Sequence, residues 1–159
     1  MALSLRPVAR SEFDLVRHIQ VEPDQTRFSG TVAQAFEEDE DGVDFHAILN
    51  GSGAAGFFKI DRLYHETYSF AAPQDLGLRA FMIDRGEQGK GLATAAAAAL
   101  KTYLPALYPG RGAVVLTVNL QNPGAIRCYL KGGFQDTGGI HPHGLAGPQH
   151  ILRMELKGR

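Results

Sequence analysis

The chain has 159 residues, of which 44% are hydrophobic and 21% charged, and this size and composition are typical of one globular domain. Sixteen basic and seventeen acidic residues give a net charge of −1, which argues against nonspecific nucleic-acid binding because that function requires a basic face. The single cysteine, Cys128, excludes an internal disulfide framework and a metal site built from several thiolates. The N-terminal residues lack a signal-peptide pattern, and the most apolar stretch, residues 91–100, is too short to span a membrane. We therefore expect a soluble, cytoplasmic single domain over residues 1–159, without nucleic-acid or membrane partners.

The first half of the chain predicts short elements joined by turns. Thr31 and Gln34 have the spacing of a capping box, and a turn at residues 50–53 separates two apolar runs in the manner of a hairpin. Residues 64–76 are polar, contain Pro73 and are expected to form a loop. In chain order, the predicted elements are a strand at residues 4–8, a helix capped by Ser11, a helix after Thr31, and strands at residues 45–49 and 56–63.

The second half alternates strands and helices. The predicted order is a strand at residues 78–83, a glycine-rich turn, a helix at 92–104 ended by Pro105, a strand at 113–118, a helix from Asn122 to Lys131, and a hairpin of residues 134–137 and 150–156. Strands and helices in this order imply a mixed sheet with helices packed on its faces. The predicted fold class is therefore α+β.

The glycine-rich turn Arg85-Gly-Glu-Gln-Gly-Lys-Gly91 joins a strand to a helix, an arrangement that holds phosphate groups on backbone N–H donors and the helix dipole. Two common phosphate-binding motifs do not fit. A P-loop requires Ser or Thr after Lys90, where Gly91 stands. A dinucleotide fingerprint beginning at Gly89 requires glycine where Thr94 stands.

Two motifs together resemble the acetyl-CoA-binding core of the GNAT superfamily of N-acetyltransferases. The family pattern Gln/Arg-x-x-Gly-x-Gly/Ala is matched by Gln88, Gly91 and Ala93. Further along the chain, the family pattern Asn-x-x-Ala-x-x-x-Tyr followed by Gly-Phe is matched by Asn122, Ala125, Tyr129 and Gly133-Phe134. The motifs lie within residues 78–138, in the family's order and on the expected types of element.

The resemblance implies a central mixed, mostly antiparallel sheet of six or seven strands with about four helices on its faces. It also implies that the strands at residues 78–83 and 113–118 splay apart, so that pantetheine binds the backbone of Met82 and Ile83, with Asn122 contacting the same arm. The pyrophosphate would be held by backbone N–H groups of Gln88, Gly89, Lys90, Gly91, Leu92, Ala93 and Thr94. Homodimerisation is expected by the same analogy.

The implied reaction moves an acetyl group from acetyl-CoA, the co-substrate, directly to the primary amine of a small molecule. Tyr129 matches the family position that donates a proton to the CoA thiolate. No covalent acyl-enzyme forms, so Cys128 need not act as a nucleophile. No metal is expected, although His141 and His143 with His150 nearby are a weak metal-site pattern. The acidic residues 37–41 fit either a solvated turn or a cation site.

Within the superfamily, the chain looks most like the spermine/spermidine acetyltransferase branch at residues 24–28, 78–84, 88–91 and 125–129. That branch carries an acidic residue where this chain has Arg79, and an arginine repels a cationic amine at close range, so an acceptor with its own carboxylate is an alternative. Four side chains fit the general base at this stage: Glu22, Asp75, Asp84 and His141. Two other functions stay open, a non-catalytic CoA-binding regulatory domain and an acetyltransferase acting on protein N-termini or lysines.

Overall fold

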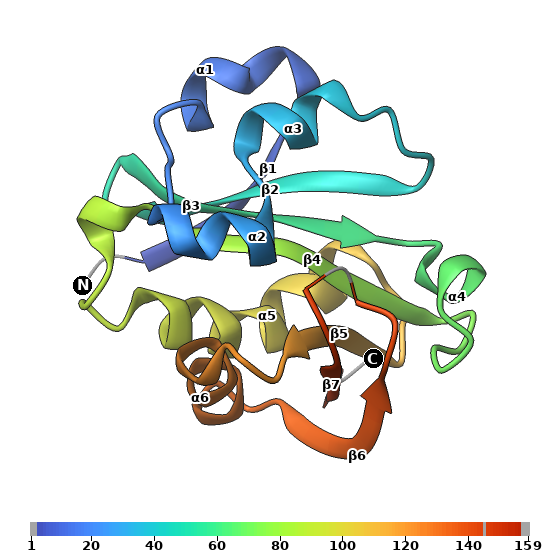
Figure 1. Ribbon diagram of the computed structural model, residues 1–159. Helices are drawn as coiled ribbons and strands as arrows, with labels where there is room; N and C mark the ends of the chain where they lie inside the picture. The colour runs from blue at the N-terminus through green and yellow to red at the C-terminus, as the bar shows by residue number, and fades with distance from the viewer. Residues whose placement is uncertain (1–2, 145, 157–159) are drawn as a thin grey trace.

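The computed structural model describes residues 3–144 and 146–156 (Figure 1). Its strands are β1 (Leu3–Val8), β2 (Val43–Asn50), β3 (Gly53–Asp61), β4 (Asp75–Ile83), β5 (Ala113–Asn119), β6 (Gln135–His141) and β7 (Gln149–Glu155). Its α-helices are α1 (Phe13–Val16), α2 (Thr26–Ser29), α3 (Val32–Glu37), α4 (Tyr64–Thr67), α5 (Leu92–Leu107) and α6 (Pro123–Lys131).

The seven strands form one sheet in the order β1-β2-β3-β4-β5-β7-β6. Within the described residues β4 and β5 are parallel, and the other neighbouring strands are antiparallel. Helices α1 and α3 lie on one face of the sheet, and α5 and α6 lie on the other (Figure 1). The predicted α+β class and the mixed, mostly antiparallel sheet are therefore confirmed.

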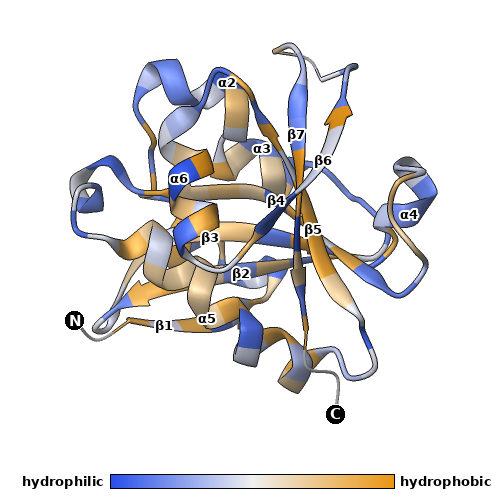
Figure 2. Ribbon diagram, turned by 90° about the horizontal axis from the view of Figure 1, so that it is seen from below, coloured by the Kyte–Doolittle hydropathy of each residue, from blue (hydrophilic) through white to orange (hydrophobic). Residues whose placement is uncertain are grey.

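Each face of the sheet builds its own core because successive side chains of a strand point to opposite faces. Phe57 and Phe58 of β3 are both fully buried but belong to different clusters. Phe57 packs with Val16 and Val32 under the short N-terminal helices, whereas Phe58 joins the cluster that contains Leu100 of α5. Hydrophobic residues accordingly follow α5 and the central strands in Figure 2.

Helix capping shows where local sequence determines structure. The capping box at Thr31 is confirmed: the Gln34 N–H donates to Thr31 Oγ1 at 3.1 Å, and the Thr31 N–H donates to Gln34 Oε1 at 3.0 Å. The prediction that Ser11 caps a helix is wrong, since Ser11 lies inside a 3-10 turn at Arg10–Glu12. There the Glu12 carboxylate accepts the Ala9 N–H at 2.8 Å.

The segment predicted as a loop at residues 64–76 contains α4, and β4 begins at Asp75, earlier than expected. Burial of Tyr64 is the physical reason, because its side chain is almost completely enclosed. Its ring lies against Gly77, where an added Cβ would approach the ring to 2.1 Å. The absence of a side chain at Gly77 thus lets a short helix close over the sheet.

Helix α5 continues past Pro105 to Leu107, so the prediction that Pro105 ends it is wrong. Proline removes one backbone donor, but the next turn still forms, with the Tyr108 N–H donating to the Leu104 carbonyl at 2.8 Å. The Tyr108 hydroxyl is in turn bound 2.9 Å from Nε2 of His46 on β2. The contact between Tyr108 and His46 therefore stabilises the last turn of α5, which the sequence pattern alone did not predict.

Candidate active site

The site lies where β4 and β5 separate. These strands pair only from Asp75 to Gly77 on β4 and from Ala113 to Val115 on β5, although both strands continue beyond. A cavity of about 1020 Å³ is lined by the diverging parts of both strands, residues 78–83 and 117–119. This short pairing agrees with the expectation that the two strands splay apart.

A bulge in β4 changes the direction of its side chains at the cavity. Phe57 pairs with Met82 but Lys59 pairs with Arg79, so β4 carries one extra residue opposite β3. Ala80 within this stretch has a φ of 53°, in the left-handed region that non-glycine residues rarely adopt. Bulges of this kind re-aim side chains and increase local twist. Here consecutive residues of β4, among them Arg79 and Phe81, all line the cavity.

The glycine-rich loop enters α5 with two left-handed glycines. Gly89 and Gly91 have φ values of 82° and 78°, and within the described residues nothing lies within 4 Å of a Cβ built at either position. These glycines are therefore required for conformation and not for close packing. The first backbone hydrogen bond of α5 runs from the Ala95 N–H to the carbonyl of the N-cap Gly91. The N–H groups of residues 92–94, which line the cavity, therefore have no helical partners.

The Gln88 side chain stabilises the glycine-rich loop by hydrogen bonds to two other segments. Its Nε2 donates to the Ile83 carbonyl and to Gln25 Oε1, each at 3.0 Å, and so ties the loop to the end of β4 and to the segment before α2. The Lys90 side chain instead lies 3.3 Å from Glu87 and does not line the cavity. The other predicted cofactor-binding residues all line it: Met82, Ile83, Gln88, Gly89, Gly91, Leu92, Ala93, Thr94 and Asn122.

Asn122 and Tyr129 both reach the cavity from α6. Asn122 is the N-cap of the helix, and its Oδ1 accepts the Ala125 N–H at 3.4 Å. The Tyr129 ring is nearly buried and packs edge-on against Phe81 and Phe134, each at 5.5 Å between ring centroids. Close contact of α6 with α5 at Gly132, where a Cβ would lie 2.6 Å from the Ala97 Cβ, fixes the helix in this place.

The Tyr129 hydroxyl is suited to donate a proton. Burial raises the pKa of Tyr129 well above its ordinary value, with a smaller contribution from neighbouring Cys128. The side chain is therefore protonated near neutral pH. Within the described part of the chain the hydroxyl forms no hydrogen bond, and Tyr129 borders the cavity.

An ion-pair cluster forms one wall of the cavity. Lys59 of β3 is almost fully buried, and its Nζ donates to Glu38 and Glu40, each at 2.9 Å. Arg79 of β4 binds Glu40 at 3.0 Å and Asp61 at 3.3 Å. Partial burial opposes ionisation of Glu40, but hydrogen bonds from both cations hold its pKa below the usual value.

This cluster alters the interpretation of Arg79 and of the acidic residues 37–41. Arg79 does line the cavity, yet its charge is matched by Glu40 and Asp61. Two carboxylates of the acidic run hold the buried Lys59, so the run is more than a solvated turn. A lysine within the mostly apolar strand β3 was the available sequence signal, but its partners depend on the tertiary fold.

Of the four candidate bases, His141 borders the cavity within the described residues, and Glu22, Asp75 and Asp84 do not. Asp75 accepts hydrogen bonds from the Ala72 N–H at 2.9 Å and from Arg153 at 3.0 Å. Asp84 accepts the Gln20 N–H at 2.8 Å. Tyr64 and Tyr68, which the sequence analysis did not single out, also line the cavity. Among residues 3–144 and 146–156, no group of three or more His, Cys, Asp or Glu side chains is placed to hold a metal ion.

A model of the acetyltransferase (GNAT) family matches residues 10–134. The chain belongs to this family. It is an N-acetyltransferase, and acetyl-CoA is its co-substrate. No curated protein sequence matches the chain. Within the described residues, no helix has the length and hydrophobicity needed to cross a membrane.

Solved GNAT-fold structures are similar over almost the whole chain. AAC(6')-Ib in complex with paromomycin and acetyl-CoA has a TM-score of 0.78 and 19% identity, covering 98% of this chain and 94% of that one. A chimera of spermidine N-acetyltransferase SpeG from Vibrio cholerae and hSSAT has a TM-score of 0.71 and 14% identity, covering 96% and 95%. The ribosomal-protein-S18-alanine N-acetyltransferase of Escherichia coli has a TM-score of 0.66 and 16% identity, covering 98% and 94%. At these identities the likeness establishes the fold.

Proposed function

We propose that the protein transfers the acetyl group of acetyl-CoA directly to the primary amine of a small cationic molecule. One observation carries this proposal: the glycine-rich loop, the separated edge of β4 and the Tyr129 ring all border the same cavity. That cavity is large enough for a cofactor arm and a small acceptor together.

The cofactor half of the proposal follows from backbone donors. Residues 88–94 place left-handed glycines and the unpaired N–H groups of α5 at the cavity, which favours the pyrophosphate. Beyond Gly77, β4 lacks β5 as a pairing partner, so the backbone at Met82 and Ile83 is available to pantetheine. Asn122 borders the same space and would contact the pantetheine arm.

The reaction needs no covalent intermediate. The neutral amine nitrogen attacks the thioester carbonyl, a C–N bond forms and the C–S bond breaks. The departing CoA thiolate takes a proton from the Tyr129 hydroxyl, which burial keeps protonated. Tyr129 then recovers a proton from the nitrogen side of the reaction, and the products are an N-acetyl amide and CoA thiol.

The carboxylates around Lys59 and Arg79 favour the binding of a cationic acceptor over that of an anionic one. Lys59 and Arg79 are opposed by three carboxylates, Glu38, Glu40 and Asp61. Glu38 uses one oxygen for Lys59 and, within the described residues, leaves the other unpaired, and Glu37 also lines the cavity. These two carboxylates would bind ammonium groups of a polyamine or an aminoglycoside more readily than a carboxylate-bearing acceptor.

The test measures CoA thiol release with spermidine, spermine, kanamycin, glycine and an alanine-initiated peptide as acceptors. We expect release with the polyamines or kanamycin, and a raised KM for that acceptor in the Glu37→Gln/Glu38→Gln variant. Asp39→Asn, an exposed neighbour outside the cavity, is the matched control and should leave KM unchanged. Release with the peptide alone would favour a protein acetyltransferase. Binding of acetyl-CoA without release from any acceptor would favour a regulatory domain.

Two further features stay predictions. We infer a homodimer, which sedimentation of the purified protein tests, and a cytoplasmic location, which fractionation of the source cells tests.

A further inference from the structure

We propose that His141 is the general base that takes a proton from the acceptor ammonium. This inference rests on the proposed acetyl transfer and adds a catalytic residue to it. His141 is the last residue of β6 and borders the cavity.

A chain of aromatic contacts connects His141 to the point where the sheet opens. Tyr64 packs on Gly77, the last residue of β4 that pairs with β5. The Tyr68 ring lies 4.5 Å from the Tyr64 ring between centroids, and the His141 ring lies 5.3 Å from Tyr68 in an edge-on arrangement. All three rings border the cavity, so the imidazole stands two aromatic contacts from the start of the strand separation.

Neighbouring rings hold the His141 imidazole in place, and its two nitrogens are free to exchange a proton. Tyr68 and Phe70 pack against its ring, the latter at 6.0 Å between centroids, while its cross-strand partner Gln149 also lines the cavity. Within the described residues neither ring nitrogen has a hydrogen-bond partner, and neither is sealed from solvent. A partly exposed imidazole with two unoccupied nitrogens is available for proton transfer with a bound acceptor.

The other side chains that could serve as the general base are ion-paired, lie outside the cavity or bind the acceptor in the proposed function. Between Gly77 and Ile83, β4 carries no carboxylate, and its charged side chain is the ion-paired Arg79. Glu40 is bound to Lys59 and Arg79. Glu38 is bound to Lys59 through one oxygen, and its other oxygen and Glu37 bind the ammonium groups of the acceptor in the proposed function. Among the described residues, the titratable groups in ring contact with His141 are Tyr68, which has Arg79 nearby, and His143, which follows β6 and lies 6.1 Å away between ring centroids.

The proton balance is complete without any additional reactant. His141 takes one proton from the R–NH3⁺ acceptor, and the resulting R–NH2 attacks the thioester. The nitrogen loses a second proton as the amide forms, while the thiolate gains one from Tyr129. One proton per turnover therefore leaves through the His141 imidazolium to solvent.

The experiment compares pH profiles of kcat/KM for the wild type, His141→Gln and His150→Gln, using whichever of spermidine, spermine or kanamycin is turned over. His150 is the matched control because it is one residue along β7 from Gln149, lies outside the cavity and sits 3.7 Å from Asp136. We expect His141→Gln to lose about 100-fold or more in kcat/KM near neutral pH, together with the acidic limb of the profile. His150→Gln should retain both, and acetyl-CoA should bind all three proteins equally.

A second acceptor separates base catalysis from a structural role. An aminooxy analogue of the working acceptor has a nitrogen that is unprotonated near neutral pH, so His141→Gln should lose far less activity with it. Equal losses with both acceptors, or an unchanged pH profile, would overturn the assignment to His141. The same profile change in His143→Gln and not in His141→Gln would transfer the role to His143 and also overturn it. Absence of thiol release by the wild type would instead refute the proposed function.

Discussion

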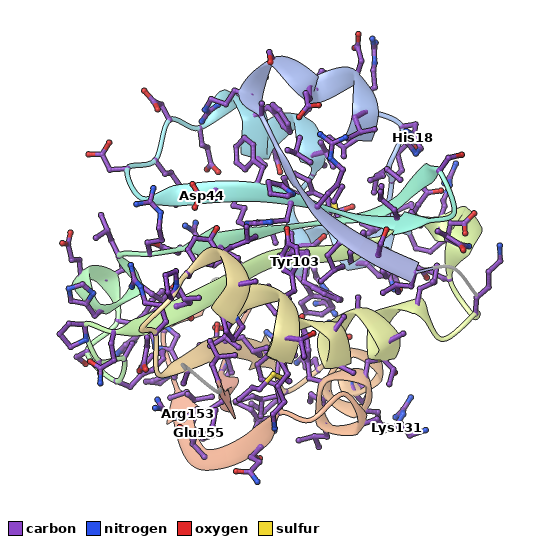
Figure 3. The ribbon with its side chains drawn as sticks, turned by 180° about the vertical axis from the view of Figure 1, so that it is seen from behind. His18, Asp44, Tyr103, Lys131, Arg153 and Glu155 are labelled. Atoms are coloured by element: carbon purple, nitrogen blue, oxygen red, sulfur yellow. The ribbon has the colours of Figure 1, made fainter. Side chains whose placement is uncertain are left out.

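His46 of β2 lies in a buried chain of hydrogen bonds that makes stability depend on pH. Its Nδ1 is 2.6 Å from the Tyr103 hydroxyl, and its Nε2 is 2.9 Å from the Tyr108 hydroxyl, which donates to Asp44 at 2.7 Å. Because the single Tyr108 proton goes to Asp44, Nε2 donates to the Tyr108 oxygen, and in the neutral ring Nδ1 then accepts from the Tyr103 hydroxyl. Figure 3 shows Tyr103 between α5 and the sheet. Burial, which lowers the pKa of His46, keeps the ring neutral near pH 7 in the native protein.

The size of the effect follows from the displaced pKa. Burial lowers the pKa of His46 from 6.5 to about 4, and the charge on Asp44 opposes this only in part. Below pH 6.5 the unfolded chain binds a proton at this residue that the folded protein does not, so stability falls as the pH is lowered. The loss amounts to about 2 kcal/mol near pH 5 and about 3 kcal/mol near pH 4, and is absent above the unfolded pKa.

Urea unfolding of the wild type and His46→Gln, followed by circular dichroism between about pH 4 and pH 7.5, tests this reasoning. Near neutral pH the variant should be less stable, because a buried hydrogen-bond chain is interrupted. The difference in unfolding free energy should then shrink by about 3 kcal/mol toward pH 4, since glutamine does not titrate. A difference that stays constant with pH would refute the neutral, buried state of His46.

Three further predictions concern the site. Tyr129→Phe should lower kcat by about 100-fold or more while acetyl-CoA affinity, measured by calorimetry, stays the same; unchanged turnover would contradict the proton-donor role. Gly91→Ala should weaken acetyl-CoA binding and reduce stability by about 1 kcal/mol, because its φ of 78° is unfavourable for a side chain. Gly51→Ala, at a φ of 68° in the β2–β3 turn, is its control and should show the stability loss alone in denaturation and binding assays. Gly77→Ala should destabilise by about 1–3 kcal/mol in urea unfolding, since its Cβ would collide with the Tyr64 ring, and wild-type stability would disprove that contact.

The sequence predicted features that depend on residues a few positions apart. The capping box at Thr31 and the N-cap at Asn122 require only local spacing, and both form as expected. The order of strands and helices, and hence the fold class, followed from hydrophobic periodicity. The motif around Gln88 also marked the glycine-rich loop that the structure places at the mouth of α5.

Where distant segments compete with a local preference, the sequence prediction failed. Pro105 was expected to end α5, but the Tyr108 hydroxyl bonds His46 on another element and the helix continues. Residues 64–76 were expected to be a loop, but Gly77, near the start of β4, accommodates the Tyr64 ring and a helical turn forms over it.

The charge environment of the site was decided by the tertiary structure. From the sequence, Arg79 is an isolated cation on a strand beside the glycine loop, and four residues compete for the role of general base. Strand register brings Lys59 beside Arg79, and the segment after α3 supplies Glu40 to both. Capping and turn formation act over a few bonds and are therefore encoded locally, whereas an ion pair depends on which strands lie next to each other. The sequence by itself determined the chemistry available at the cofactor loop, and the fold determined which charges face the acceptor.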